Sequence, residues 1–110
     1  MLDEKIAPLV EALNELDFVT TIGSCQGHPE GIGLNGGNGY KTPNVIFQTS
    51  PQSVTRLREL IMDAKLICTW VIDEFNQDKS QYSLTARYDE SFSLGKAWFD
   101  VGQLTNVIRG

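Results

Sequence analysis

The stretch Leu66–Tyr88, LICTWVIDEFNQDKSQYSLTARY, contains two apolar patterns separated by a short polar segment. Leu66–Phe75 is an apolar run with Trp70 at its middle, too short for most helices and rich in β-branched residues, which predicts a central strand. Gln81–Tyr88 alternates apolar and polar side chains, the period of a strand with one face in the core. Because Asn76–Ser80 is a polar turn, we expect the two strands to form a hairpin.

The residues before this hairpin predict two helices and two strands. Residues 2–16 carry apolar side chains at steps of three and four, the spacing of an amphipathic helix. Phe18–Ile22 is expected to be a strand that stops at Gly23, and Asn44–Thr49 a second strand. Ser50 followed by proline is a helix start, with the hydroxyl at the N-cap. The expected buried stripes are Leu2, Ile6, Leu9, Val10, Leu13 and Leu16 in the first helix, and Val54, Leu57, Ile61 and Ala64 in the second.

The C-terminal part of the chain allows two interpretations. Phe92–Trp98 could form a strand, but a helix is favoured by apolar spacing further on. The predicted order is therefore α-β-loop-β-α-β-β-α, which lacks the strict alternation of a parallel sheet. We predict one α+β domain over residues 1–110, with an antiparallel or mixed sheet of about four strands and helices on one face. The helical spacing is that of Ala97, Val101, Leu104 and Ile108.

Composition and charge narrow the class of protein. Of the 110 residues 41% are hydrophobic and 21% charged, as in ordinary folded domains. The net charge of −5 disfavours nucleic acid and anionic membranes as partners, because both attract clustered lysine and arginine. The chain starts without the basic and apolar regions of an export signal and holds two cysteines, so we expect reduced thiols and a cytoplasmic protein. No apolar run approaches the ~20 residues that span a bilayer.

A glycine-rich segment separates the first two predicted strands. Between Gly23 and Pro43 the chain carries six of its ten glycines, which predicts a long loop of the kind that often has a function. Gly31–Gly36 matches the dinucleotide-binding pattern in letters. Its context disagrees with that pattern, because no strand directly precedes Gly31 and the following glycines and proline disfavour a helix.

Ser24-Cys25-Gln26-Gly27-His28 is the segment with the most chemical potential. Glycines two residues on either side of Cys25 outline a nucleophile elbow, although no helix is expected after it. Cys25 and His28 could also act as nucleophile and base, with Glu30 orienting the imidazole. The simpler interpretation is a cysteine packed at a strand end and a histidine that pins the loop.

Metal binding is not predicted for this segment. Cys25 and His28 have the spacing of half a zinc site, but Cys68 is the only other thiol and His28 the only imidazole of the chain. A structural Cys/His site is therefore excluded by count, whereas a catalytic site would need a carboxylate or water as its fourth ligand. We expect no cofactor.

Two resemblances include residues 13–27. Leu13–Gly27, LNELDFVTTIGSCQG, resembles the start of the wybutosine-synthesis methyltransferase-like family, which implies tRNA modification with S-adenosylmethionine. Roughly residues 9–61 resemble small uncharacterised bacterial and phage proteins, in which a helix and strand run into Ser-Cys-x-Gly-His. That second group carries no activity that could be transferred.

The leading hypothesis is a small, acidic, non-enzymatic binding protein, in the role of an accessory or inhibitory protein of a mobile genetic element. Its partner would be a protein with a basic surface, and a homo-oligomer stays open. The alternatives are a small enzyme that uses Cys25 and His28 for catalysis, and an accessory of tRNA modification. The candidate binding residues are Ser24, Cys25, Gln26, His28, Asn35 and Tyr40.

Overall fold

The computed structural model describes residues 5–25 and 42–110. Its order of helices and strands is the predicted one, and the fold is an α+β mix. The elements are α1 (Ala7–Asn14), β1 (Thr20–Cys25), β2 (Asn44–Gln48), α2 (Pro51–Asp63), β3 (Trp70–Asn76), the 3-10 helix η2 (Gln77–Lys79), β4 (Gln81–Ala86) and α3 (Leu94–Arg109).

The four strands form one sheet in the order β1-β2-β4-β3, and every neighbouring pair is antiparallel. The predicted hairpin is confirmed as β3 and β4. The prediction of a central strand over Leu66–Phe75 is wrong, because β3 starts at Trp70 and lies at the edge of the sheet. The apolar residues that precede Trp70 belong to the connection from α2, where Cys68 is buried against α3.

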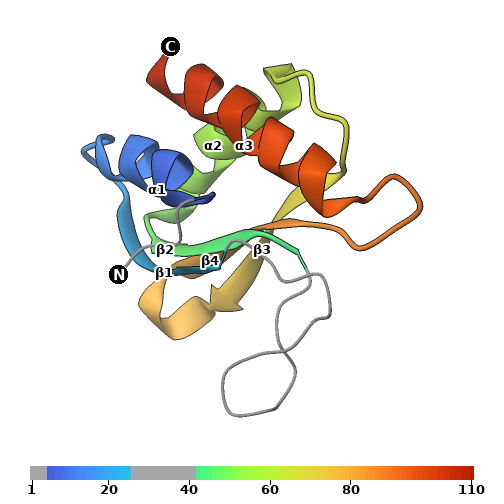
Figure 1. Ribbon diagram of the computed structural model, residues 1–110. Coiled ribbons are helices and arrows are strands. Elements are labelled where there is room, and N and C mark those ends of the chain that lie inside the picture. The colour runs from blue at the N-terminus through green and yellow to red at the C-terminus, as the bar shows by residue number, and fades with distance from the viewer. Residues whose placement is uncertain (1–4, 26–41) are drawn as a thin grey trace.

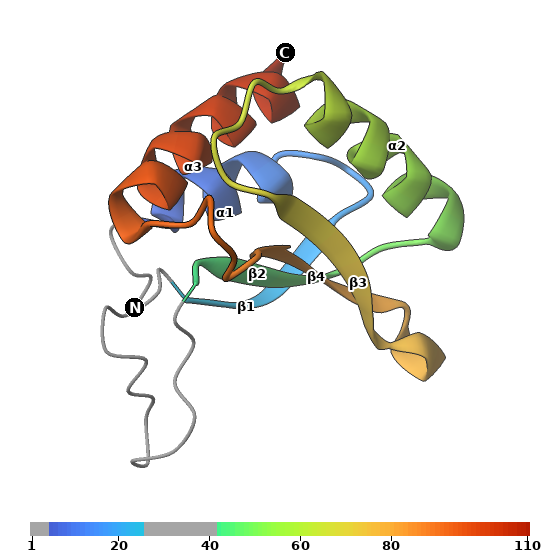
Figure 2. The same ribbon diagram turned by 90° about the vertical axis from the view of Figure 1, so that its right-hand side faces the viewer.

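All three helices pack on one face of the sheet, and the core lies between these two layers (Figure 1, Figure 2). Strand alternation turns Val45, Phe47 and Leu84 toward the helices, where each is buried. None of the helices within the described ranges has the length and apolar content to cross a membrane. The predicted helical stripes supply much of the core, with Ile6, Leu9, Val10, Leu13, Val54, Leu57, Ala97, Val101, Leu104 and Ile108 all buried.

Two of the helices have a serine as their N-cap residue. The Ser50 hydroxyl accepts a hydrogen bond from the Ser53 backbone N–H at the start of α2, which confirms the predicted N-cap. Ser93 caps α3 in the same way, accepting from the Lys96 N–H. The strand alternative over Phe92–Trp98 is wrong, because Leu94 already begins α3.

Two element ends differ from the sequence prediction. Strand β1 does not stop at Gly23 but continues to Cys25, and a bulge at Ile22 shifts its register against β2. A bulge increases the local twist of a strand, and glycine adapts easily to such a twist. Gly23 therefore accompanies the bulge inside β1 and does not end the strand. Tyr88, expected on the core side of the last strand, follows the end of β4 and is 67% exposed.

Candidate functional site

The predicted site at the end of β1 is only partly inside the described residues. Ser24 pairs with Val45, and Cys25, the last residue of the strand, pairs with Asn44. Successive strand residues point to opposite faces, so Ser24 lies on the helix side of the sheet and Cys25 on the other side. Both residues belong to extended, paired backbone. The other candidate residues, Gln26, His28, Asn35 and Tyr40, lie outside the described residues.

Cys68, the second thiol, is 5% exposed and lies between α3 and the segment before it. Cys68 forms no disulfide. Burial raises the pKa of the Cys68 thiol, and the negative charge of Asp100 raises it further. A thiol with a raised pKa forms little thiolate at neutral pH, which fits the position of Cys68 in the core.

Alkylation of the native protein should separate the two thiols. We expect iodoacetamide to modify Cys25 while Cys68 stays protected until urea unfolds the protein, because only Cys25 is partly exposed. The variants Cys25→Ser and Cys68→Ser assign each adduct in the mass spectrum. Ordinary thiols react slowly at pH values well below ~8.5. Fast modification of Cys25 in that pH range would favour the enzyme hypothesis. Fast modification of Cys68 in the folded state would contradict its placement in the core.

Asp100 of α3 is a buried carboxylate that sequence analysis did not single out. It is 0% exposed, and its oxygens accept hydrogen bonds from the backbone N–H groups of Ile67 at 2.9 Å and Cys68 at 2.7 Å. The indole N–H of Trp70 donates to the same carboxylate at 3.1 Å. Asp100 therefore fixes the connection into β3 and the orientation of the Trp70 ring. Its position within the buried stripe of α3 was the available signal.

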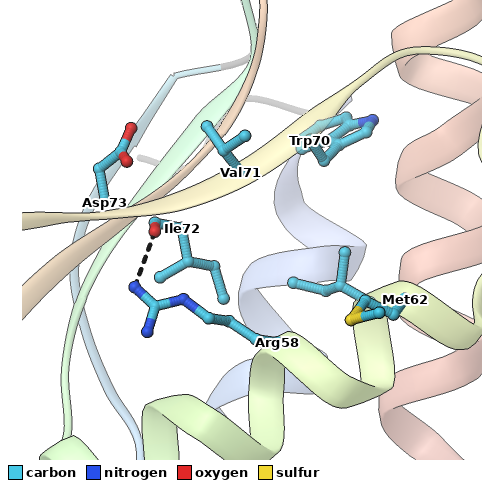
Figure 3. A pocket seen from close by; sticks show the side chains of 7 residues that line it. Arg58, Met62, Trp70, Val71, Ile72 and Asp73 are labelled. Carbon is cyan, nitrogen blue, oxygen red and sulfur yellow. Dashed lines mark hydrogen bonds between the residues drawn. The ribbon is translucent and has the colours of Figure 1, made fainter.

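The Trp70 ring lines a cleft between α2 and the edge strand β3 (Figure 3). The cleft has a volume of about 310 Å³. Its inner surface is apolar, because Trp70 and Ile72 are buried and Ile61 is half-buried. Met62 lies at the cleft with 83% of its surface exposed. The lining residues are Arg58, Ile61, Met62, Trp70, Val71, Ile72 and Asp73.

Arg58 connects the two sides of this cleft. Its guanidinium donates a hydrogen bond to the backbone oxygen of Ile72 at 2.9 Å, from α2 to the outer edge of β3. The sequence places Arg58 with Arg56 and Lys65 on a charged helix face that looks merely solvated. In the structure Arg58 occupies a hydrogen-bonding position of an edge strand.

The other edge of the sheet is protected in a similar way. The Thr21 N–H of β1 donates to Asn14 Oδ1 at 3.0 Å, and Asn14 Nδ2 donates to the Thr21 hydroxyl at 2.7 Å. A helix residue thus covers a backbone group on each edge, a common device against unwanted strand pairing. The β3 edge combines this cover with an apolar cleft.

The cleft is lined by one cationic and one acidic side chain, Arg58 and Asp73. Asp73 lines the cleft and Glu74 follows it on β3, and both are exposed. The one cationic lining residue, Arg58, is bound to the Ile72 carbonyl. Val71 and Asp73 project from the side of β3 opposite to Ile72 (Figure 3). The cleft therefore offers an apolar inner surface on one side of the strand and a carboxylate on the other.

Residues 5–25 and 42–110 contain neither a cluster of metal ligands nor an aromatic surface for stacking bases. No group of three histidine, cysteine, aspartate or glutamate side chains there could hold a metal ion. The aromatic residues also form no common stacking surface for bases, because Trp70 and Tyr82 are buried beneath the helices while Tyr88 is exposed. Comparison with protein-family models, curated proteins and solved structures finds no match for this chain. The two resemblances of residues 13–27 and 9–61 stay predictions.

Proposed function

We propose that this chain is a small, acidic, non-enzymatic binding protein, and that the α2–β3 cleft is its docking site for a protein partner. The observation that supports this most is the apolar cleft next to an edge strand, with Met62 strongly exposed at its rim. Apolar concave surfaces with an exposed large side chain are typical of binding sites. The hydrogen bond to Asp100 holds the Trp70 ring in place, so this wall of the cleft is fixed before a ligand binds.

Charge supports a basic surface on the partner. The chain has a net charge of −5, and Asp73 and Glu74 are exposed on the strand that borders the cleft. Complementary charge speeds association and selects among partners. A role as accessory or inhibitory protein of a mobile genetic element is part of this proposal. A catalytic role for Cys25 and His28 remains the alternative hypothesis.

Site-specific photocrosslinking in host cells tests this proposal. A photoreactive phenylalanine analogue at position 62 should give a light-dependent, protease-sensitive adduct, whereas the same analogue at the exposed Asn106 of α3 should not. Combining position 62 with Asp73→Lys and Glu74→Lys should weaken the adduct about tenfold, because the carboxylates would no longer attract the partner. Equal adducts at both positions, or an adduct unaffected by charge reversal, would contradict the proposal. A nuclease-sensitive adduct would instead support the tRNA-modification alternative.

A further inference from the structure

The outer edge of β3 has a regular pattern of backbone groups. In an antiparallel pair, successive residues direct their N–H and C=O groups alternately toward and away from the neighbouring strand. The Arg87 N–H donates to the Thr69 oxygen at 2.7 Å, so Thr69 faces β4. Trp70 and Ile72, in register with Ala86 and Leu84, therefore direct their backbone groups to the outer edge. The Arg58 hydrogen bond to the Ile72 oxygen confirms this direction.

This edge lies open along the cleft. In the sheet order β3 has β4 on one side only, and no described strand pairs with its other side, where α2 lies across the cleft (Figure 2). The groups at the edge can accept the backbone of an added strand, which is a known mode of peptide recognition in which side-chain pockets provide the specificity. An edge strand beside a helix, with an apolar cleft between them, is suited to this mode.

We propose that the α2–β3 cleft binds an extended segment of the partner protein, which adds to the sheet as a further strand beside β3. This inference rests on the proposed function and names the form of its ligand. An added strand would lie ~4.8 Å from β3, with side chains alternating between the two faces of the sheet. Every second side chain would enter the cleft against Trp70, Ile61 and Ile72, so these positions of the segment are apolar.

The remaining positions of the segment are basic. Its other side chains would lie on the face of the sheet to which Asp73 and Val71 project. Lysine or arginine there would meet the exposed Asp73 carboxylate, and cross-strand pairs of opposite charge stabilise strand pairing. The recognised segment therefore alternates apolar and basic residues.

Charge disfavours a second copy of this chain as the occupant. Antiparallel pairing of two β3 strands about Ile72 would place the two Arg58 guanidinium groups side by side, since each binds the Ile72 oxygen of its own chain. Two chains of charge −5 also repel each other at low salt. A basic segment from another protein meets neither obstacle.

Arg58 acts as a cap that the incoming strand must displace. The Ile72 oxygen that it occupies is one of the acceptors that an added strand would use. When a cap competes with the ligand, only the molecules with an open cap can bind. The measured affinity is then the intrinsic affinity multiplied by the open fraction. Removing this cap should tighten binding, whereas an ordinary contact residue would weaken binding when removed.

A short fluorescent peptide that alternates valine and lysine tests the inference directly. We expect it to bind with a Kd below ~1 mM at low salt, and Arg58→Ala to tighten binding about three- to tenfold. Arg56→Ala is the matched control, since it removes the same charge two positions away, roughly 200° around α2. It should change the affinity less than about twofold. Asp73→Lys should weaken binding about tenfold.

Peptide N-methylation separates strand pairing from mere docking. Methylation of the valine amides should abolish binding if the added strand runs antiparallel to β3, and methylation of the lysine amides if it runs parallel. The other series should bind within about twofold of the unmethylated peptide. Hydrogen exchange at the Ile72 amide should also slow when the unmethylated peptide is bound.

The results distinguish the two levels of the proposal. Equal binding of both methylated series with retained sensitivity to Asp73→Lys would overturn strand addition but leave the cleft as a docking site. An affinity unaffected by Asp73→Lys, or absent binding at ~1 mM peptide, would contradict both. Dimerisation of Arg58→Ala without peptide would identify a second copy as the occupant and would overturn the proposed segment.

Discussion

Replacing Asp100 with alanine should lower the free energy of unfolding by about 3–5 kcal/mol. The substitution leaves the buried Cys68 N–H and Trp70 indole N–H without their acceptor, together with the partly buried Ile67 N–H. Each unpaired buried donor costs about 1–3 kcal/mol, because water cannot replace the lost partner. A domain of this size has only about 5–15 kcal/mol of stability, so the variant should be close to unfolded.

Urea unfolding followed by circular dichroism measures this loss. Asp100→Asn keeps the shape of the side chain but brings an amide NH2 group toward N–H donors. Its free energy of unfolding should therefore lie between those of wild type and Asp100→Ala. Asn106→Ala, at an exposed position of the same helix, is the control and should stay within about 0.5 kcal/mol of wild type. A loss below about 1 kcal/mol for Asp100→Ala would mean that the three donors find other partners, against the geometry described above.

Asp100 illustrates which part of the structure the sequence could predict. The spacing of Ala97, Val101 and Leu104 predicts the buried stripe of α3, and all three are buried. Asp100 lies on the same stripe, so its burial could have been suspected from that position. Its partners could not, because the N–H groups that it binds are 32 and 33 positions away in a connection without periodicity.

The sheet shows the same division between local and long-range information. The hairpin follows from two patterns that are adjacent in the chain, and it is confirmed. The placement of β3 at the edge depends on β2 inserting on the far side of β4, a pairing between distant residues. An apolar run such as Leu66–Phe75 is equally compatible with a central strand and with a buried connection that leads into an edge strand.

The site predicted around Cys25 and His28 stays a prediction, because most of that segment lies outside the described residues. The segment from Ser24 to Tyr40 contains residue types that carry recognisable chemistry, which is why it is predictable as a site from sequence. The α2–β3 cleft consists of ordinary core and helix residues whose significance arises only from their arrangement. Arg58 shows this most clearly, since a helix arginine among acidic neighbours gives no local signal that it binds the carbonyl of an edge strand.

Replacing Phe47 with alanine should cost about 3–5 kcal/mol, the second large effect that we expect. Phe47 is 0% exposed on the central strand β2, in register with Tyr82, and the two ring centroids are 6.0 Å apart. The covering helices and the neighbouring strands limit how far the core can collapse into the vacated volume. The cost therefore combines lost burial with a residual cavity.

Phe75→Ala provides a matched comparison, because it removes the same ring from the edge strand β3. Phe75 is 55% exposed and lies where the register of β3 shifts against β4, so its loss should cost less than about 1 kcal/mol. Urea unfolding of both variants measures the difference directly. If Leu66–Phe75 were the central strand, as its apolar pattern alone predicts, the Phe75 substitution would be as costly as that of Phe47. Equal costs would thus contradict the strand order, and with it the open edge on which the proposed docking site depends.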